Sequence, residues 1–226
     1  VMDLMQPFTD PAIVAGYVAG TPRKVPGFAD LHRMAMLLLA ERAPDPADIL
    51  VVGAGGGLEL KAFGAAQARW RFVGIDPSPD MLDLARRVLG PLQSRVVLQQ
   101  GYVEDAPAGP FDGAACLFTL HFLARAERLC TLRDIHRRLK PGAAFVAAHH
   151  SSPKDGDPVR WLARSVAFAR EAGADSGQAS ASVAIMAERL PILSVDEDEA
   201  LLREAGFSDV AQFYAGFSFR GWVAVA

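Results

Sequence analysis

Residues 49–58 read Ile-Leu-Val-Val-Gly-Ala-Gly-Gly-Gly-Leu, and residues 72–76 read Phe-Val-Gly-Ile-Asp. An apolar run that ends in alternating glycines predicts a buried parallel strand that turns sharply into a helix. The glycines allow a ligand to approach the backbone closely because they have no Cβ atom. Asp76 ends the second run, where its carboxylate can accept hydrogen bonds from a ribose diol. Together the two runs predict a nucleoside-type cofactor site at a helix N-terminus.

The spacing of the glycines decides between two cofactor classes. A dinucleotide fingerprint has the form Gly-x-Gly-x-x-Gly, with a third glycine that permits close helix–strand packing. Here the glycines occupy positions 53, 55 and 57, and Leu58 stands where that third glycine belongs. The resulting form, Gly-x-Gly-x-Gly, resembles the first motif of the class I S-adenosylmethionine-dependent methyltransferases.

Five later segments resemble the remaining motifs of that family, in the family's order: residues 76–82, 96–107, 111–122, 139–148 and 202–210. Ser78 and Pro79 have the residue types that begin a helix, directly after the acid that holds the ribose in the family. The resemblance implies an α/β, Rossmann-like fold. Its sheet would have seven mostly parallel strands and end in an antiparallel hairpin, with N-terminal helices and a small helical cap around it.

The resemblance also implies S-adenosylmethionine as the cofactor and assigns residues to its site. The implied cofactor-binding residues are Phe28, Gly53, Ala54, Gly55, Gly57, Asp76, Pro77, Met81, Gly101, Tyr102, Val103, Leu117 and Phe118. The chain departs from the family pattern at two of its acids. Val51 replaces the acid that contacts the methionine ammonium group, and Tyr102 replaces the acid on the adenine amine. We therefore expect backbone carbonyls of the glycine turn and of Leu117 to contact the ammonium group.

Composition restricts the class of protein. The chain has 226 residues, of which 51% are apolar, and a net charge of −3 from intermixed signs. The absence of a basic stripe disfavours a large nucleic-acid surface without excluding a local one. Residues 1–10 lack the features of a signal peptide, and no apolar run approaches the roughly 20 residues of a membrane span. We therefore expect a soluble cytoplasmic protein; the sequence leaves a homodimer open.

The pattern along the chain indicates one methyltransferase domain, residues 1–226. Residues 1–46 form an N-terminal helical segment, with helices starting at Asp10 and near Phe28. Residues 47–150 alternate strands and helices and form the cofactor-binding core. Residues 151–195 form a helical cap insertion with a loop near residues 173–177, and residues 196–226 form a helix and two strands. The hairpin turn is expected at Ala215 and Gly216.

Three segments, residues 23–28, 117–123 and 213–226, resemble the carboxy-S-adenosylmethionine synthase-like branch of the family. Those relatives make a carboxylated cofactor that is used in wobble-uridine modification of transfer RNA, and the resemblance places Phe28 over the cofactor. In that branch an arginine from the cap binds the carboxylate of the cofactor. Alignment of residues 185–188 with the cap places Ala184 at the position of that arginine in this chain. The sequence therefore predicts a methyltransferase that uses plain S-adenosylmethionine on an unidentified small molecule or nucleotide. The carboxylated form is the alternative.

Histidines supply the candidate catalytic bases. His121 follows the fourth motif, and His149 and His150 end the strand after it, at the sheet edge where ligands of open sheets bind. Because adjacent strand residues point to opposite faces, at most one of His149 and His150 can face the pocket. The catalytic candidates are His121 and His149. His32 and His136 lie in predicted helices and are expected on the surface.

Other residues have both a functional and a structural interpretation. Glu104 and Asp105 are expected in a solvated loop, and the two cysteines are expected to be buried and unpaired, Cys116 on a strand and Cys130 on a helix. The cysteine and histidine spacings contain no zinc pattern. Trp161, Phe168 and Met186 either line a substrate pocket or pack in the core, and Phe217, Phe219 and Trp222 belong to the core or to a dimer interface. Two further alternatives for the function of the whole chain are a cofactor-binding protein without catalysis and an NAD-dependent dehydrogenase.

Overall fold

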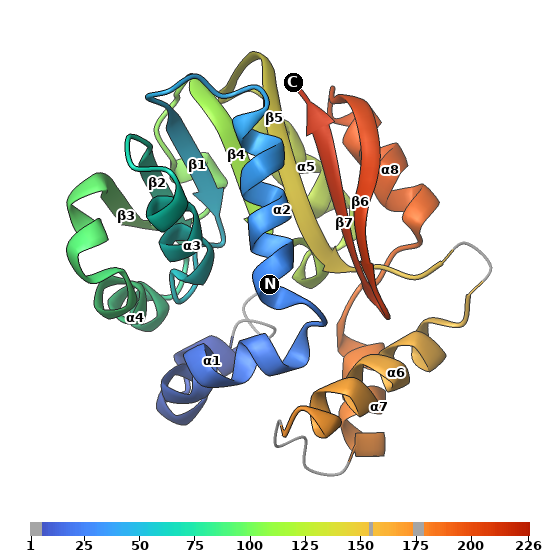
Figure 1. Cartoon of the computed structure of the whole chain (residues 1–226). Coiled ribbons are helices and arrows are strands. Elements are labelled where there is room, and N and C mark those ends of the chain that lie inside the picture. The colour runs from blue at the N-terminus through green and yellow to red at the C-terminus, as the bar shows by residue number, and fades with distance from the viewer. Residues whose placement is uncertain (1–5, 154–155, 174–178) are drawn as a thin grey trace.

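A seven-stranded sheet with the strand order β3-β2-β1-β4-β5-β7-β6 crosses the whole molecule (Figure 1). The computed structural model describes residues 6–153, 156–173 and 179–226, so most of the loop expected near residues 173–177 lies outside the described residues. The strands are β1 (Asp48–Val52), β2 (Arg71–Asp76), β3 (Val96–Gln100), β4 (Phe111–Leu117), β5 (Leu139–His150), β6 (Ser208–Gly216) and β7 (Phe219–Val225). Strands β1 to β5 pair in parallel, and β7 runs antiparallel to β5 and β6. This topology confirms the predicted fold class.

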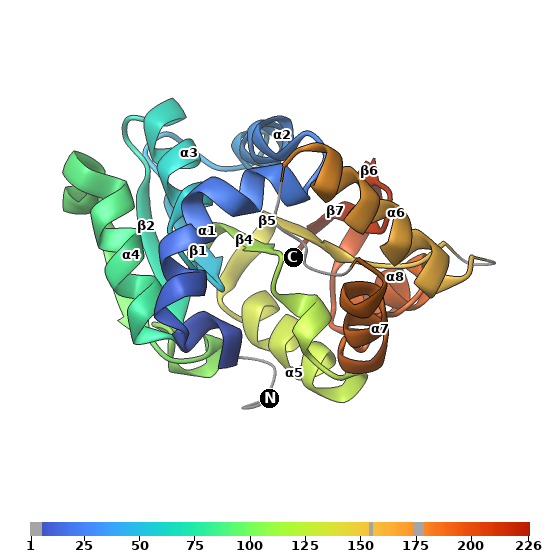
Figure 2. The ribbon, with the colours of Figure 1, turned by 90° about the horizontal axis from the view of Figure 1, so that it is seen from below.

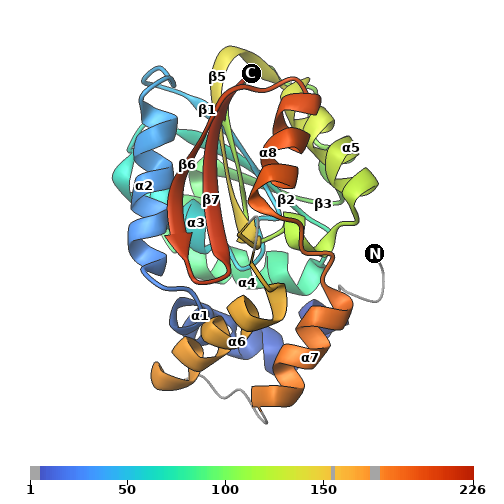
Figure 3. The ribbon, with the colours of Figure 1, turned by 90° about the vertical axis from the view of Figure 1, so that its right-hand side faces the viewer.

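Helices cover both faces of the sheet (Figure 3). On one face lie α2 (Phe28–Ala40), α3 (Leu58–Ala66) and α4 (Pro79–Leu89), and on the other lie α5 (Arg125–His136) and α8 (Val195–Glu204). Alternate residues of β1 enter the two layers: Leu50 and Val52 pack with α5 and α8, whereas Ile49 and Val51 pack with α2 and α3. This alternation follows from the two-residue period of a strand.

Three more helices lie beyond the carboxyl ends of the parallel strands, below the sheet in Figure 1. They are α1 (Pro11–Lys24), α6 (Pro158–Glu171) and α7 (Ala179–Arg189). Seen from below, α1 crosses the sheet edge and continues toward α6 (Figure 2). Short 3-10 turns complete the chain: η1 (Gln6–Thr9), η2 (Gly90–Arg95), η3 (Val103–Asp105) and η4 (Leu120–Phe122). None of the helices in the described part of the chain is long and apolar enough to span a membrane.

The predicted helix starts are confirmed by their caps. The Asp10 carboxylate accepts a hydrogen bond from the Ala12 N–H at 2.8 Å and begins α1. The Ser78 hydroxyl accepts one from the Met81 N–H at 3.2 Å and begins α4, with Pro79 at the first helical position. These side chains satisfy N–H groups that have no partner inside the helix. Ser78 thereby fixes where α4 begins, directly after Asp76.

A buried ion pair joins the two helices that cover the second face. Arg128 of α5 is fully buried, and its guanidinium donates to the Asp198 carboxylate of α8 at 2.5 Å. A second guanidinium nitrogen donates to the Pro191 carbonyl at 2.9 Å. The Asp198 carboxylate also lies 3.1 Å from His149 Nε2. Burial by itself raises the pKa of Asp198, but His149 and Arg128 outweigh it, so that the pKa is lowered.

The predicted position of the terminal hairpin turn is wrong by two residues. Gly216 still pairs with Phe219, so the turn consists of Phe217 and Ser218, and Phe217 adopts a positive φ of 52°. A glycine is needed at 216 for another reason, because a Cβ atom there would collide with the Tyr214 hydroxyl. Of the aromatic residues considered for a dimer interface, Phe219 and Trp222 are buried in the core and Phe217 is 39% exposed.

Candidate functional site

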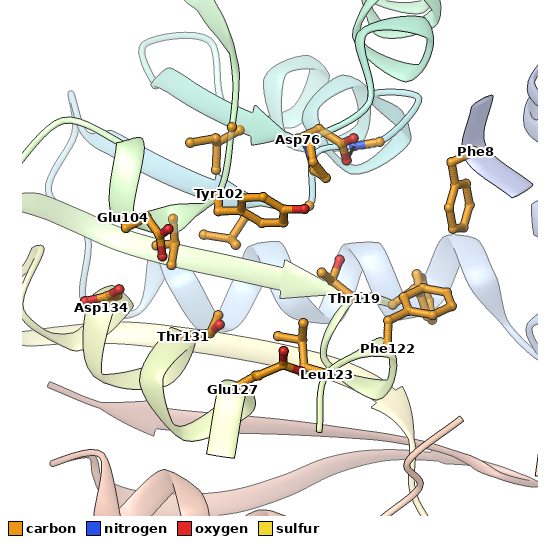
Figure 4. Close-up of a pocket in the computed structure, with 18 of the residues that line it drawn as sticks. Phe8, Asp76, Tyr102, Glu104, Thr119, Phe122, Leu123, Glu127, Thr131 and Asp134 are labelled. Atoms are coloured by element: carbon orange, nitrogen blue, oxygen red, sulfur yellow. Dashed lines mark hydrogen bonds between the residues drawn. The ribbon is translucent and has the colours of Figure 1, made fainter. Parts of the chain in front are cut away.

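A cavity of about 520 Å³ opens at the carboxyl edge of the sheet, where the neighbouring strands β1 and β4 end (Figure 4). In open α/β sheets this switch point between strand orders is where ligands bind. Segments that are far apart in sequence line it: η1, α1, the glycine turn, the ends of β2 and β4, η3, η4 and α5. The cavity is thus built around the stretch that the sequence singled out.

The glycine turn forms one wall of the cavity and is held by close contacts. Gly53, Gly55 and Gly57 all have positive φ, at 73°, 47° and 75°. A Cβ atom at Gly53 would collide with the Thr119 side chain, and one at Gly56 would lie 2.8 Å from the Tyr17 ring. The turn therefore requires glycines for conformation at three positions and for space beside Thr119 and Tyr17.

Asp76 fixes the turn from the next strand. Its two carboxylate oxygens accept hydrogen bonds from the Gly55 N–H at 2.8 Å and the Ser78 N–H at 2.9 Å. Burial raises the pKa of the carboxyl, and these two N–H groups act against that rise. Each carboxylate oxygen has a further lone pair, so the group can still accept hydrogen bonds from a ligand in the cavity.

Aromatic side chains enclose one end of the cavity. Phe8 of η1 meets Phe122 of η4 edge to face, with ring centroids 5.6 Å apart. Phe118, which has a positive φ of 59°, also lines the cavity and stacks on Phe28 of α2 with centroids 5.9 Å apart. Figure 4 shows Phe8 and Phe122 at one end and Glu104 and Asp134 at the other.

The opposite end of the cavity is acidic. Glu104 of η3 and Glu127 and Asp134 of α5 line it, together with Tyr102. The Glu127 carboxylate also accepts a hydrogen bond from the Ala124 N–H at 3.0 Å at the start of α5. In the described part of the chain no lysine, arginine or histidine contributes to the lining. The site therefore suits a ligand that is neutral or positively charged.

Comparisons with known proteins agree with this geometry. Residues 50–145 match a family model described as a methyltransferase domain. A carboxy-S-adenosyl-L-methionine synthase from Alteromonas mediterranea is 24% identical over 223 residues, which are 96% of this chain and 91% of that protein. One from Salmonella arizonae is 27% identical over 210 residues, 90% of this chain and 84% of that protein. The solved S-adenosylmethionine-dependent methyltransferase SibL superposes with a TM-score of 0.60 at 19% identity, covering 88% of this chain but only 56% of SibL.

The chain is similar to the class I S-adenosylmethionine-dependent methyltransferases in a matching domain model over residues 50–145, in its curated relatives and in its fold. Its cofactor is S-adenosylmethionine, and the cavity fits that molecule. The glycine turn leaves room for a ligand beside its backbone, and the Asp76 carboxylate can accept hydrogen bonds from ribose hydroxyls. A lining that among the described residues has acids but no cationic side chain suits a ligand whose net charge is positive.

The structure brings most of the predicted cofactor residues of this methyltransferase together around the cavity. Those that line it are Gly53, Gly55, Asp76, Pro77, Met81, Gly101, Tyr102, Val103, Leu117 and Phe118. Three others do not line it. Ala54 is fully buried in the core, Gly57 is the cap residue of α3, and Phe28 lies behind Phe118. Glu104 is exposed in a short turn, as expected, and also lines the open cavity.

Sequence reasoning missed the lining residues that come from helices packed across the sheet edge. Phe8 and Tyr17 come from the N-terminal segment, and Thr119, Phe122, Leu123, Ala126, Glu127, Cys130, Thr131 and Asp134 come from the region after β4. The only signal for these residues in the sequence was that Phe8 and Tyr17 are aromatic, and by itself this did not indicate a ligand. Cys130, which we expected to be buried, is exposed.

The structure does not bring His121 or His149 into the cavity lining. His121 is 5% exposed, and its Nδ1 atom accepts a hydrogen bond from the His150 N–H at 3.3 Å. His149 faces the other side of the sheet, beside Trp222 and Asp198. The His150 ring stacks on Phe219, and its Nδ1 atom is 2.8 Å from the Ser218 hydroxyl. All three rings lie in the layers behind the cavity wall because each is held by core residues.

The expected surface position of His32 is also wrong. His32 is 4% exposed, and its ring packs on Phe28 and Phe63. His136 is half-buried, with its Nε2 atom inside and its ring against Phe207. A histidine is amphipathic, so the helical pattern around it cannot tell an apolar contact from exposure to solvent.

We expect three buried histidines of this methyltransferase to make it less stable in acid. Burial lowers the pKa of His32 to about 4, burial and His149 lower that of His150 to about 3, and burial and His150 lower that of His121 well below its usual value. Such a histidine takes up its proton only in the unfolded chain. Its contribution to the stability of the folded state is therefore present above pH ~6.5 and is lost below it. Each histidine accounts for a loss of about 2 kcal/mol between about pH 7 and pH 5.

Glu59 opposes part of this loss. Burial raises the pKa of its carboxyl to about 8, so between about pH 8 and 4.5 acid favours the folded state by up to about 1.4 kcal/mol for each pH unit. Between about pH 7 and pH 5 we therefore expect the free energy of unfolding to fall by about 3 kcal/mol in the wild type and by about 6 kcal/mol in Glu59→Gln. Urea unfolding at both pH values measures it. Equal stability at the two pH values would show that the histidines are solvated.

Proposed function

We propose that this chain transfers a methyl group from unmodified S-adenosylmethionine to a small molecule held at the aromatic end of the cavity. The observation that carries the proposal is the charge of the lining, which among the described residues contains several acids but no lysine, arginine or histidine. A carboxylate or phosphate on the acceptor would find no cation in this lining to pair with it, and unpaired buried charges are costly. S-adenosylmethionine has a net positive charge, because its ammonium and sulfonium groups outweigh its one carboxylate, and an uncharged acceptor adds no anion.

The proposed orientation of the cofactor follows from the three parts of the cavity. Asp76 would accept hydrogen bonds from the ribose hydroxyls, and Tyr102 and Val103 would cover the adenine near the acidic end. Gly53 and Gly55 would lie against the amino-acid portion. The bound cofactor supplies an activated methyl group, and this orientation directs that group toward Phe118 and the aromatic end.

The aromatic end would position the acceptor and exclude water from it. Phe8 and Phe122 come from two different turns and close that end, with Phe118 as its floor. Alignment of the nucleophile with the methyl group provides most of the catalysis in such a transfer. An apolar acceptor fits these side chains better than a nucleotide does, because no cation lines the cavity to neutralise a phosphate.

The acceptor would have to present an unprotonated nucleophile. His121 and His149, the bases predicted from the sequence, do not line the cavity, and burial keeps His121 neutral behind its wall. Tyr17 does line the cavity, but burial and the nearby acids Glu59 and Asp76 raise the pKa of its hydroxyl. It would therefore remain protonated and act as a hydrogen-bond donor. A neutral amine needs no base from the protein to attack the methyl group.

A second candidate is supported by the curated relatives, which are named carboxy-S-adenosyl-L-methionine synthases. Synthesis of carboxy-S-adenosylmethionine by this chain would require a cationic side chain near the carboxylated methyl group. Ala184, at the cap position where the sequence comparison expects an arginine, is an exposed residue of α7. Arg220 is buried near the cap, but its guanidinium donates to the carbonyls of Phe217 and Phe219 and it does not line the cavity. These contacts favour the first candidate.

Two measurements test the proposal. Calorimetric titration should show binding of S-adenosylmethionine and no binding of NAD. Mass spectrometry of the ligand that copurifies should give the mass of S-adenosylmethionine or its demethylated product, and not the heavier carboxylated form. Binding of NAD alone would refute the methyltransferase activity, whereas recovery of the carboxylated cofactor would replace the first candidate by the second.

A further inference from the structure

Thr119 is a polar residue of the cavity wall that has no role in the cofactor orientation proposed above. It directly precedes η4 and is half-buried, and Figure 4 shows it between Asp76 and Phe122. A threonine at this position ordinarily accepts a hydrogen bond from a backbone N–H of the helix that it begins. The Thr119 side chain makes no such bond. Its oxygen is therefore not used by the local backbone.

Contacts within the wall fix the Thr119 hydroxyl. It donates its proton to the Leu117 carbonyl at 3.2 Å. Its oxygen lies directly against the glycine turn, because a Cβ atom at Gly53 would overlap it. The hydroxyl also interacts with the Cys116 thiol, which is fully buried. A hydroxyl oxygen has two lone pairs, so these contacts leave at least one of them for a ligand beside Gly53.

This part of the wall offers hydrogen-bond acceptors to a ligand. The proton of Thr119 is engaged with Leu117, whose carbonyl oxygen has a second lone pair and can accept another hydrogen bond. Among the described residues that line the cavity there is no lysine, arginine or histidine. Such a place suits a positively charged donor. The amino-acid portion of the cofactor would lie against Gly53, and its ammonium group is a donor of that kind.

We propose that the Thr119 hydroxyl accepts a hydrogen bond from the α-ammonium group of S-adenosylmethionine. The inference rests on the proposed function, and it assigns this contact to a side chain where the sequence predicted backbone carbonyls alone. The Leu117 carbonyl would be the second acceptor. The contact would hold the ammonium group between Gly53 and Thr119, and would thereby position the methionyl chain whose sulfur carries the methyl group.

Thr119→Ser and Thr119→Ala form a matched pair, because the two variants differ from each other only in the hydroxyl group. Both side chains are smaller than threonine, so neither adds an atom against Gly53, where the Thr119 oxygen already makes close contact. We expect the affinity for S-adenosylmethionine to fall by about 10- to 100-fold in Thr119→Ala, the usual effect of losing a hydrogen bond to a charged group. In Thr119→Ser it should stay within about threefold of the wild type.

Two analogues locate the contact on the cofactor. Decarboxylated S-adenosylmethionine keeps the ammonium group and lacks the carboxylate, whereas 5′-methylthioadenosine lacks the whole amino-acid portion. Thr119→Ala should weaken the binding of decarboxylated S-adenosylmethionine by the same factor as that of S-adenosylmethionine. Its affinity for 5′-methylthioadenosine should stay within about twofold of the wild type. Isothermal titration calorimetry measures all three ligands.

The outcomes separate this inference from the proposed function. If S-adenosylmethionine does not bind to the wild type, the proposed function fails. If it binds equally well to both variants, or if Thr119→Ala weakens 5′-methylthioadenosine to the same extent, the cofactor remains but Thr119 is not its ammonium contact. A loss with S-adenosylmethionine but not with its decarboxylated form would assign Thr119 to the carboxylate and would overturn the inference as well.

A crystal structure of the wild-type protein with S-adenosylhomocysteine decides the question should Thr119→Ala fail to fold. That ligand keeps the ammonium group of the cofactor. A distance of at most about 3.3 Å between its amino nitrogen and Thr119 Oγ1 would support the contact, and a longer distance would overturn it.

Discussion

Asp76→Asn is expected to weaken the binding of S-adenosylmethionine by at least about 100-fold. The Asp76 carboxylate accepts hydrogen bonds from the Gly55 and Ser78 N–H groups and lines the cavity, where we propose that its remaining lone pairs bind the ribose hydroxyls. Hydrogen bonds to a charged group contribute about 1.5–3 kcal/mol each, so two of them correspond to about 100- to 10,000-fold in affinity. Asparagine also offers an N–H₂ group to one backbone donor and leaves that donor unpaired. Isothermal titration calorimetry measures the loss.

Asp112→Asn is the matched control for Asp76→Asn. Asp112 is buried to the same extent, at 6% exposed, and it too accepts a hydrogen bond from a backbone N–H, that of Asp48, at 2.9 Å. It lies at the start of β4, at the edge of the sheet opposite the cavity, and pairs with Lys140 at 2.6 Å. We expect this control to lower thermal stability without changing cofactor affinity. If both variants lose affinity equally, Asp76 acts on the fold and not on the ribose.

Arg128→Met is expected to lower the free energy of unfolding by about 3–5 kcal/mol, because it leaves the buried Asp198 carboxylate without its guanidinium partner. Asp198 is 2% exposed and would keep its contacts with His149 and Ser151, neither of which carries the fixed charge of a guanidinium. The Pro191 carbonyl would lose its donor as well. Because α5 forms one wall of the cavity, part of the loss should also appear as weaker cofactor binding. Urea unfolding measures the stability change.

Two further variants identify the cause of that loss. Adding Asp198→Asn to Arg128→Met should restore part of the stability, since it removes the charge that was left alone. Arg125→Met breaks the Arg125–Glu204 pair at 3.3 Å, which joins the same two helices on the surface. It should cost less than about 1 kcal/mol, because exposed ion pairs contribute little. A loss as large as that of Arg128→Met would show that helix packing, and not the buried charge, is responsible.

The predictions that the structure confirmed depended on local features of the chain. The glycine turn, the strand ending in Asp76 and the cap at Ser78 are each encoded within a few neighbouring residues. Backbone conformation and capping follow from such neighbours, so the fold class and helix starts were predictable. The same reasoning misplaced the hairpin turn, because Gly216 is required by its contact with Tyr214 and not by the turn.

The features that sequence reasoning missed depend on contacts between distant segments. Phe8 and Tyr17 reach the cavity because η1 and α1 cross the carboxyl edge of the sheet. His121 and His149 sit at the predicted edge, yet their rings are held among core residues and not in the cavity. The direction of a side chain at a strand end depends on what packs there, and one sequence does not contain that information.

The sequence by itself predicted a nucleoside-binding turn at the end of β1 and favoured S-adenosylmethionine over a dinucleotide, because glycine spacing and a strand-terminal acid are local properties. Only the tertiary structure decided how the charges are arranged around that turn. It showed acids and aromatic rings lining the cavity, and histidines buried behind its wall. Charge complementarity depends on the distances between side chains from different elements, and folding alone sets those distances.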